Sequence, residues 1–473
     1  MKKQAFNPYL PNFEYIPDGE PYVFGDRVYV YGSHDQFGGK AFCMNDYVCW
    51  SAPVDDLGNW RYEGVIYRKE QDPRYQTGNC MFAPDITPGP DGRYYLYYTL
   101  DTTGSMAVAV ADTPVGPFAY YGRVQDSDGH VLGDRAGDIF QFDPGVLVDD
   151  DGRVWLYSGF AEKVSNPRVK HLRRDKAYCM ELERDMLTVK AGPTPILPGI
   201  SNAAGTEFEE HPFFEASSIR KINGLYYLVY SSSWQHELCY AVSRYPDRDF
   251  KAGGAIVSNG DVGLERWTTG HSANYLDNNH GGLVKIGAQW YIFYHRHTNY
   301  HQYSRQACAE KVYFAPDGSI PQVEMTSCGL NSTDLLGQGT YPAAIACQLY
   351  AQGGACGTTR ADPSIHPAFT QDGPDREDTE GQYITHLRQG SVAGFKYFDL
   401  SQTTRIGIQV RGCAGIMRVY NRIGGDLLSQ IPFEASDEYR TYYGALTGGT
   451  AHSGLFFQVE TDGSIDFLAF ELL

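Results

Sequence analysis

Five ionisable side chains stand at matched places along the first two thirds of the chain. Each lies 10 to 12 residues before an aromatic residue that follows a short turn. The five are Asp18, Asp85, Asp143, Glu215 and His280, and the aromatic residues are Tyr29, Tyr95, Trp155, Tyr227 and Tyr291. Carboxyl groups crowded into a partly desolvated space repel one another, so some are held protonated while others stay ionised. Acid–base hydrolysis of an acetal requires such a pair of states.

The aromatic residues belong to a repeat in which a turn leads into a short aromatic strand. Its copies read FGDRVYVYGS, PDGRYYLYYT, DDGRVWLYSG, INGLYYLVYSS and IGAQWYIFYH, with spacings of 66, 60, 72 and 64 residues between anchors. Strand-rich repeats at regular spacing are typical of propeller blades. If the ionisable residue begins the innermost strand of each blade, all five gather around one axial channel. Unrelated hairpins would leave the even spacing unexplained.

The repeat stops near Thr340, and alternating strands such as TRIGIQVRG, MRVYNRIGG and IDFLAFELL follow. Alternation of apolar and polar residues between turns predicts a β-sandwich of jelly-roll type. The sequence therefore predicts an all-β protein, with a five-bladed β-propeller over residues 1–325 and a β-sandwich over 335–473. We expect residues 185–205 to form a loop, and no long helix before residue 320.

Composition narrows the classes of partner. The net charge of −18 would repel phosphate backbones, so no nucleic-acid partner is expected, and no run of 18 apolar residues predicts a membrane span. No apolar leader follows Met1, and the 10 cysteines lack CxxC spacing. We therefore expect reduced thiols in a cytoplasmic protein, while a secreted protein that has lost its leader stays open. HExxH and GxSxG motifs are also absent.

At its repeat motifs the chain resembles glycoside hydrolase family 43. NPYLPNFEYIPDGEPYVFGDRVYVYGSHD is similar to the first-blade signature of that family, which implies that Asp18 is the general base, although PDGEP replaces the more usual ADPxP. FDPGVLVDDDG implies that Asp143 orients the acid and tunes its pKa. FFEASSIRKINGLYYLVYSS implies that Glu215 is the general acid. Asp85 follows Ala-Pro, and we expect it to be structural.

The resemblance also implies residues that contact substrate. Phe82 stands where the family usually has a pocket Trp, and Arg305, within HQYSRQ, resembles an Arg that contacts the terminal sugar. NNHGGLVKIGAQWYIFYHRHT places His280 at the channel. His280 has three interpretations: a substrate contact, a core histidine, or a ligand through water molecules of a channel ion such as Ca²⁺. The reaction itself requires no cofactor.

The function that the resemblance implies is an inverting exo-glycosidase that releases terminal pentoses from plant-cell-wall oligosaccharides. We favour α-L-arabinofuranosidase over β-xylosidase. A non-catalytic sugar-binding propeller and a retaining enzyme that acts on fructosides are the alternatives. The C-terminal part resembles family 6-like carbohydrate-binding modules, with Tyr397, Tyr442 and Tyr443 as candidate sugar contacts. It could instead only buttress the propeller.

Overall fold

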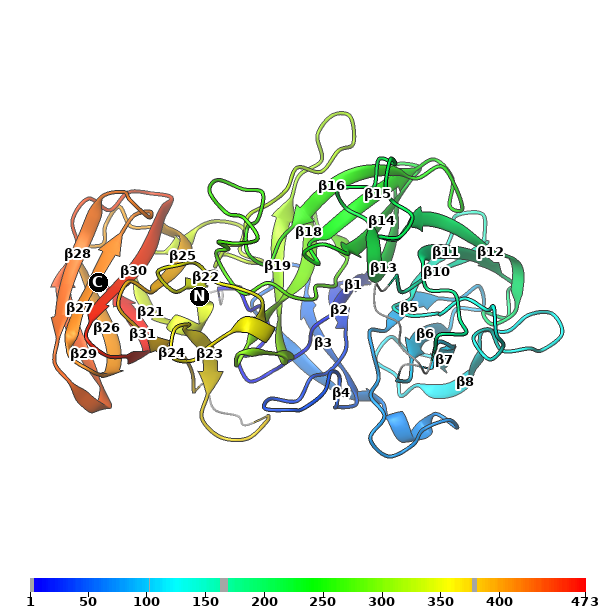
Figure 1. The fold of residues 1–473 in the computed structure, drawn as a ribbon, viewed down its shortest axis with the longest axis horizontal. Coiled ribbons are helices and arrows are strands. Elements are labelled where there is room, and N and C mark those ends of the chain that lie inside the picture. The colour runs from blue at the N-terminus through cyan, green and yellow to red at the C-terminus, as the bar shows by residue number, and fades with distance from the viewer. Residues whose placement is uncertain (1–3, 102, 162–168, 377–380) are drawn as a thin grey trace.

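The computed structural model describes residues 4–101, 103–161, 169–376 and 381–473. Within these ranges the chain is almost entirely β, and its helical elements are three 3₁₀ turns: η1 (Lys69–Gln71), η2 (Ala343–Ile345) and η3 (Thr358–Arg360). Figure 1 shows a ring of sheets beside a C-terminal sandwich. In the described ranges no helix combines the length and apolar character that crossing a membrane requires.

Five antiparallel sheets form the ring, and they follow one another in chain order (Figure 1). The first four have four strands and the fifth has three. Blade 1 contains β1 (Glu20–Phe24), β2 (Arg27–Tyr31), β3 (Tyr47–Pro53) and β4 (Arg61–Tyr67). Blade 2 contains β5 (Asp85–Pro88), β6 (Tyr94–Thr99), β7 (Met106–Ala111) and β8 (Ala119–Arg123). Blade 3 contains β9 (Gly145–Val148), β10 (Val154–Ser158), β11 (Lys176–Leu182) and β12 (Val189–Pro198).

Blade 4 contains β13 (Phe213–Ile222), β14 (Leu225–Ser232), β15 (Leu238–Ser243) and β16 (Lys251–Val257), and blade 5 contains β17 (Leu283–Ile286), β18 (Gln289–Thr298) and β19 (His301–Val312). Every anchor aromatic of the repeat lies on the second strand of its sheet. The five-bladed prediction is therefore confirmed.

The first and last blades close the ring through backbone contacts. Strand β1 lies against β17, and Gly19 forms a parallel bridge with Gly281. The N-terminal segment runs along β19, where the Tyr9 N–H donates to the carbonyl of Ala307. Segments more than 250 residues apart in the sequence are thus joined, which fixes the position of the segment that carries Asp18.

Tyrosine holds neighbouring blades together, which accounts for the high aromatic content. Tyr31, Tyr97 and Tyr157 each stand two residues after the anchor of their blade and are fully buried. Their hydroxyl groups donate at 2.6–2.7 Å to the carbonyls of Pro114, Met186 and Pro246, which lie in or beside the next blade. Each ring contributes apolar area while its hydroxyl finds a partner, as buried tyrosine requires.

The prediction of a loop over residues 185–205 is wrong for its central part, because Val189–Pro198 form strand β12. This outer strand pairs with β11 through several bulges and is largely exposed. Pro193, Pro195 and Pro198 conceal it in the sequence. Proline is tolerated there because an edge strand has one side without a neighbour.

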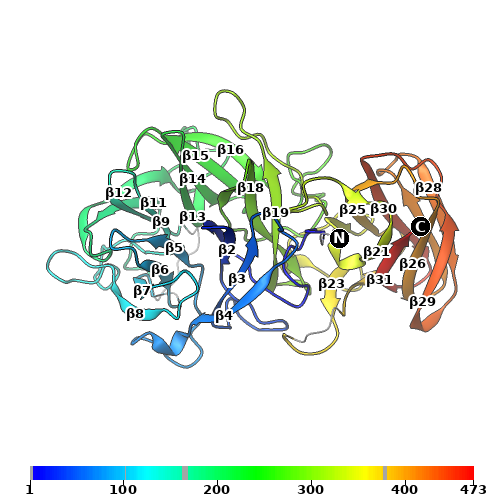
Figure 2. The ribbon, with the colours of Figure 1, turned by 180° about the vertical axis from the view of Figure 1, so that it is seen from behind.

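Two six-stranded sheets form the C-terminal sandwich and enclose their own apolar core. One contains β20 (Leu335–Leu336), β22 (Gln348–Tyr350), β25 (Val392–Asp399), β27 (Gly415–Tyr420), β28 (Leu427–Phe433) and β30 (Ser453–Thr461). The other contains β21 (Gly339–Pro342), β23 (Ala368–Gln371), β24 (Gln382–Leu387), β26 (Arg405–Gly412), β29 (Ser436–Ala445) and β31 (Ile465–Leu472). Seen from behind in Figure 2, β25 and β30 lie nearer the propeller than β28 and β29 do. Tyr350, Val392 and Phe456 join an apolar cluster shared with blades 4 and 5.

Candidate active site

One cavity of about 420 Å³ collects the predicted site residues. Its lining includes Asp18, Phe82, Asp143, Glu215, His280 and Arg305. Asp18 and Asp143 each stand two residues before an innermost strand, His280 stands three before one, and Glu215 is the third residue of β13. Inner strands of a propeller begin at the same end of the channel, so equivalent positions in separate blades converge.

Asp85 does not line this cavity. It begins β5 and is fully buried, where it accepts hydrogen bonds from the Tyr22 hydroxyl (2.6 Å) and the Val146 N–H (2.7 Å). Burial, followed by the charge of nearby Glu20, raises the pKa of Asp85 to about 7. Its partners lie in blades 1 and 3, which agrees with the structural role expected for Asp85.

Asp18 is held by cationic and hydrogen-bonding groups. Its backbone adopts the left-handed region (φ 59°), and its N–H donates to His295 Nδ1 at 3.2 Å. The Arg305 guanidinium donates to Asp18 Oδ1 at 2.9 Å. Burial raises the pKa of Asp18 above the ordinary carboxyl value, and the positive charge of Arg305 opposes that rise. Asp18 is thus desolvated and paired with a cation.

Arg305 uses most of its donors within the protein. Its Nε and Nη2 bind the two oxygens of Asp35 at 2.8 and 2.9 Å, and Nη1 reaches Asn278 Oδ1 at 3.1 Å as well as Asp18. Only 4% of the Arg305 side chain is exposed. The predicted sugar contact stays a prediction, while the structure shows an ion pair with Asp18.

A β-bulge aims Glu215 into the cavity. The register between β13 and β14 shifts on both sides of Glu215, and Ala216 adopts φ 66°, which is rare for a residue with a Cβ. The Ala216 N–H donates to Asp143 Oδ2 at 3.1 Å. Burial, followed by the negative charge of Asp143, raises the pKa of Glu215 well above its ordinary value. Such a carboxyl group stays protonated and can act as an acid.

His280 lies between two carboxylates. Its Nδ1 is 3.6 Å from Asp143 Oδ2, and its Nε2 is 3.7 Å from Glu20 Oε1. Burial alone would lower the pKa of His280, but these carboxylates outweigh it and raise that pKa. Among the described residues neither ring nitrogen of His280 has a hydrogen-bond partner, which leaves room for a water molecule or a substrate hydroxyl. Ca²⁺ takes six to eight oxygen ligands, so His280 alone does not define a calcium site, and an ion held through water molecules stays a prediction.

An aromatic wall faces the acid side of the cavity. Phe82 packs on Phe142 with ring centroids 5.0 Å apart, and Phe160 contacts Phe214 at 5.1 Å. The Phe82 platform was predicted from the sequence, whereas Phe140, Phe142 and Phe160 were not. Phe140 and Phe142 lie just before β9, and Phe160 follows β10 within blade 3. Phenylalanine in a β protein gives no signal that it faces a cavity instead of a core.

Sequence reasoning also missed the polar residues that support Asp18 and His280. Asp35 and His295 bind Arg305 and the Asp18 backbone, and Glu20 faces His280. The one signal for Glu20 was its position two residues after Asp18, but the left-handed backbone of Asp18 means that the pair does not share one strand face. Asp35 and His295 carried no comparable signal.

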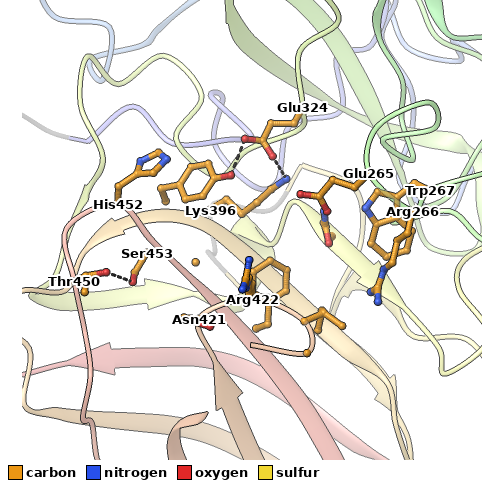
Figure 3. A pocket seen from close by; sticks show the side chains of 16 residues that line it. Glu265, Arg266, Trp267, Glu324, Lys396, Asn421, Arg422, Thr450, His452 and Ser453 are labelled. Carbon is orange, nitrogen blue, oxygen red and sulfur yellow. Dashed lines mark hydrogen bonds and ion pairs between the residues drawn. The ribbon is translucent and has the colours of Figure 1, made fainter. Parts of the chain in front are cut away.

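A second, larger pocket of about 600 Å³ lies between the propeller and the sandwich (Figure 3). Lys396 donates to Glu324 at 2.6 Å and lies 3.4 Å from Asp261, and the Tyr397 hydroxyl donates to Glu324 at 2.7 Å. Tyr397 also stacks on His452, with centroids 3.9 Å apart. These contacts fasten strand β25 to the propeller. None of the predicted catalytic carboxyl groups lines this pocket.

The other candidate sugar contacts of the sandwich also have protein partners. The Tyr442 hydroxyl donates to the carbonyl of Glu434, and that of Tyr443 donates to Glu471. Arg405 covers the Tyr443 ring at 4.0 Å. Sugar binding by these residues stays a prediction.

The sequence profile of glycosyl hydrolases family 43 matches residues 7–320, the stretch that carries all five blades. The chain belongs to glycosyl hydrolases family 43. A xylosidase/arabinosidase from Thermoclostridium stercorarium is 48% identical over 478 residues, covering 100% of this chain and 99% of the relative. The chain is therefore a glycoside hydrolase with a β-propeller fold. The name of the relative includes both xylosidase and arabinosidase, so it does not choose between these two activities.

Solved structures support the fold of this family 43 member. A family 43 arabinoxylan arabinofuranohydrolase from Bacillus subtilis, in complex with cellotetraose, superposes with a TM-score of 0.53 and 20% identity over 99% of both chains. A β-xylosidase/α-arabinofuranosidase from a compost metagenome, in complex with xylotriose and calcium-free, gives a TM-score of 0.52 and 24% identity, covering 68% of this chain and 98% of that one.

Proposed function

We propose that this family 43 hydrolase releases terminal α-L-arabinofuranosyl residues from plant-cell-wall oligosaccharides with inversion of configuration. The observation that supports it is the presence of Asp18, Asp143 and Glu215 in the lining of one cavity. A volume of about 420 Å³ lies at the small end of the range for ligand pockets, roughly 300–1,000 Å³. Such a cavity suits a terminal sugar better than a long polymer.

In this proposal Glu215 protonates the leaving oxygen while Asp18 takes a proton from the attacking water. Inversion needs an acid and a base on opposite sides of the sugar with a water between them. The raised pKa of Glu215 suits the acid, and the Arg305 ion pair suits a base that must be ionised.

Asp143 acts on Glu215 and not on the sugar. Its carboxylate binds the N–H of Ala216, next to the acid, and its negative charge raises the pKa of Glu215. The positive charge of His280 in turn offsets the negative charges of Asp143 and Glu20. The chain of charges from Glu20 to Glu215 keeps the acid protonated in the resting enzyme.

The reaction needs no cofactor, because two carboxyl groups and a water molecule complete it. A calcium ion in the channel, held through water molecules near His280, stays a prediction. Oligosaccharides are the proposed substrate, and the aromatic wall offers apolar faces for sugar rings.

β-Xylosidase activity is the second candidate, since the 48% identical relative is named for both activities. The nitrophenyl glycosides of α-L-arabinofuranose and β-D-xylopyranose, assayed under identical conditions, discriminate between them. We expect a higher kcat/KM for the arabinofuranoside. A higher value for the xyloside would reverse the assignment.

The stereochemistry has its own test. Proton NMR of the first-formed sugar should show the β-anomer from an α-arabinofuranoside. Accumulation of the α-anomer before mutarotation would contradict inversion, and the role of Asp18 as base would fall with it.

A further inference from the structure

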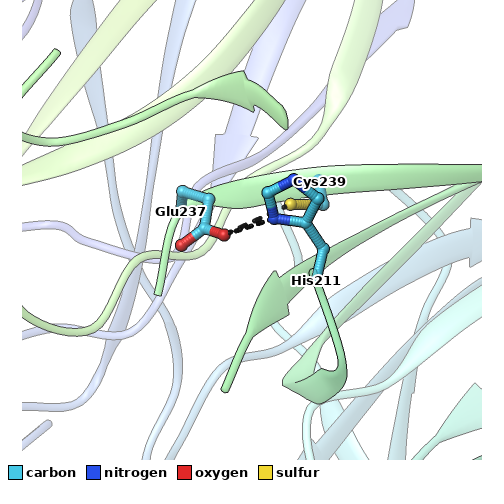
Figure 4. A group of neighbouring side chains, drawn as sticks. All are labelled: His211, Glu237 and Cys239. Atoms are coloured by element: carbon cyan, nitrogen blue, oxygen red, sulfur yellow. Dashed lines mark hydrogen bonds and ion pairs between the residues drawn. The ribbon is translucent and has the colours of Figure 1, made fainter. Parts of the chain in front are cut away.

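Three potential metal ligands converge beside the active site but take no part in the proposed reaction. They are His211, Glu237 and Cys239, and Figure 4 shows their side chains directed at one another. One ligand atom from each lies within 4.8 Å of the other two. Imidazole nitrogen, carboxylate oxygen and thiolate sulfur are the ligands that Zn²⁺ takes in proteins. The cluster thus has the chemistry of a zinc site.

The hydrogen bonds within the cluster point at a single oxygen. His211 Nδ1 is 2.7 Å from Glu237 Oε1, and the Cys239 thiol donates to the same oxygen at 3.8 Å. In a tetrahedral zinc site the ligand atoms lie about 3.3–3.8 Å apart, given bonds of roughly 2.0–2.3 Å. Small side-chain shifts would bring the three to that spacing.

Glu237 supplies a second, independent sign of a ligand. Its side chain is only 4% exposed, and among the described residues its Oε2 has no hydrogen-bond partner. A buried carboxylate oxygen without a partner is costly, and a cation bound by both oxygens of Glu237 would remove that cost. The His211 side chain is 29% exposed, which leaves a path for an ion and a water ligand.

The position of the cluster in the chain links it to the cavity. His211 stands four residues before Glu215, and Glu237 directly follows His236, which lines the cavity and contacts Phe214 at 4.8 Å. An ion held here would join the segment entering β13 to the turn before β15. Both segments border the candidate acid.

We propose that His211, Glu237 and Cys239 bind one Zn²⁺ ion, with water as the fourth ligand. Binding breaks the S–H bond of Cys239 and releases that proton to solvent. His211 coordinates through Nδ1 and carries its proton on Nε2, and an imidazolium would release one further proton. Thiolate and carboxylate together neutralise the ion, so the buried site has no net charge.

Cobalt is the probe for this site, because a Cys–Co²⁺ bond gives a charge-transfer band in the near ultraviolet. The full-length protein, stripped with a chelator, should bind one Co²⁺ per chain with that band and lose it on addition of one equivalent of Zn²⁺. Zn²⁺ alone should raise the Tm of the stripped protein, as does any ligand that binds only the folded state.

Cys239→Ser and His211→Ala should each abolish the band and the Zn²⁺-dependent rise in Tm. Cys179→Ser is the matched control, since Cys179 is equally buried in the same apolar cluster, and it should keep both. His211 is partly exposed, so His211→Ala tests the site without a core substitution. No band in the wild type, or a band that persists in both site variants, overturns the proposal.

Discussion

The two sides of the catalytic cavity surround their carboxyl groups with different neighbours. On one side Asp18 lies among polar partners, with Arg305 2.9 Å away and His295 at its backbone N–H. On the other side Glu215 stands next to Phe214 and a wall of phenylalanines, with the negative Asp143 as its charged neighbour. Both groups are buried, but the charge that acts most strongly on Asp18 is a cation and the one that acts most strongly on Glu215 is an anion.

This difference explains how two similar side chains are assigned to opposite roles. Burial raises the pKa of both, but Arg305 opposes the rise at Asp18 whereas Asp143 adds to it at Glu215. The pKa values are therefore driven apart, so the base can be ionised while the acid is protonated. The surroundings of each carboxyl group, and not its residue type, decide whether it acts as acid or base. Substitutions can change the surroundings of Asp18 and those of Glu215 separately.

Removing the base should have the largest effect. Asp18→Asn should lower kcat/KM by about 10⁴-fold, because water activation is lost whatever the leaving group. The rates of nitrophenyl and unactivated pentosides should fall together. Asp26→Asn, an exposed change in the turn after β1, is the control and should leave the rate unaltered. Substantial activity of Asp18→Asn would assign the base to another residue.

Removing the acid should have a smaller and more selective effect. Glu215→Gln should slow unactivated oligosaccharides by about 10³-fold, but aryl glycosides with very acidic leaving groups far less, because these need little protonation. A plot of log kcat/KM against leaving-group pKa measures this. Exposed Glu210→Gln serves as the control. Equal losses on every leaving group would exclude Glu215 as the acid.

Arg305 should set the acid limb of the pH profile. Activity is lost as pH falls through the pKa of Asp18, because the base becomes protonated. Removal of the Arg305 cation raises that pKa. Arg305→Met should therefore move the acid limb of kcat/KM upward by about 1 pH unit or more. Arg305→Lys retains the charge and should move it less. An unmoved limb in Arg305→Met would show that the ion pair does not control Asp18.

The aromatic wall should set the basic limb, with the smallest effect of the four. Activity is lost as pH rises through the pKa of Glu215, and admitting water lowers that pKa. Phe160→Ala should thus move the basic limb downward by a fraction of a pH unit, whereas Phe160→Leu should move it less. The pH dependence of kcat/KM on an oligosaccharide measures it. An upward shift in Phe160→Ala would contradict the role of desolvation.

The comparison also indicates which parts of the site a sequence can reveal. Asp18, Asp143, Glu215 and His280 were found because a repeated strand places equivalent residues at equivalent positions. Asp35 and His295 were missed because their roles depend on contacts with Arg305 and Asp18, about 270 residues or more away in the chain. Strand β12 was missed because its prolines conceal an edge strand.

The sequence by itself determined the five blades and the sandwich, because strand periodicity and even spacing are local properties that survive in the folded ring. It also predicted that five ionisable residues converge; four of them line the cavity, while Asp85 is buried among its neighbours. Only the tertiary structure decided which carboxyl group lies beside a cation and which lies against phenylalanine. It also brought His211 to Glu237 and Cys239. Burial and charge pairing come from residues distant in the chain, so no local pattern encodes them.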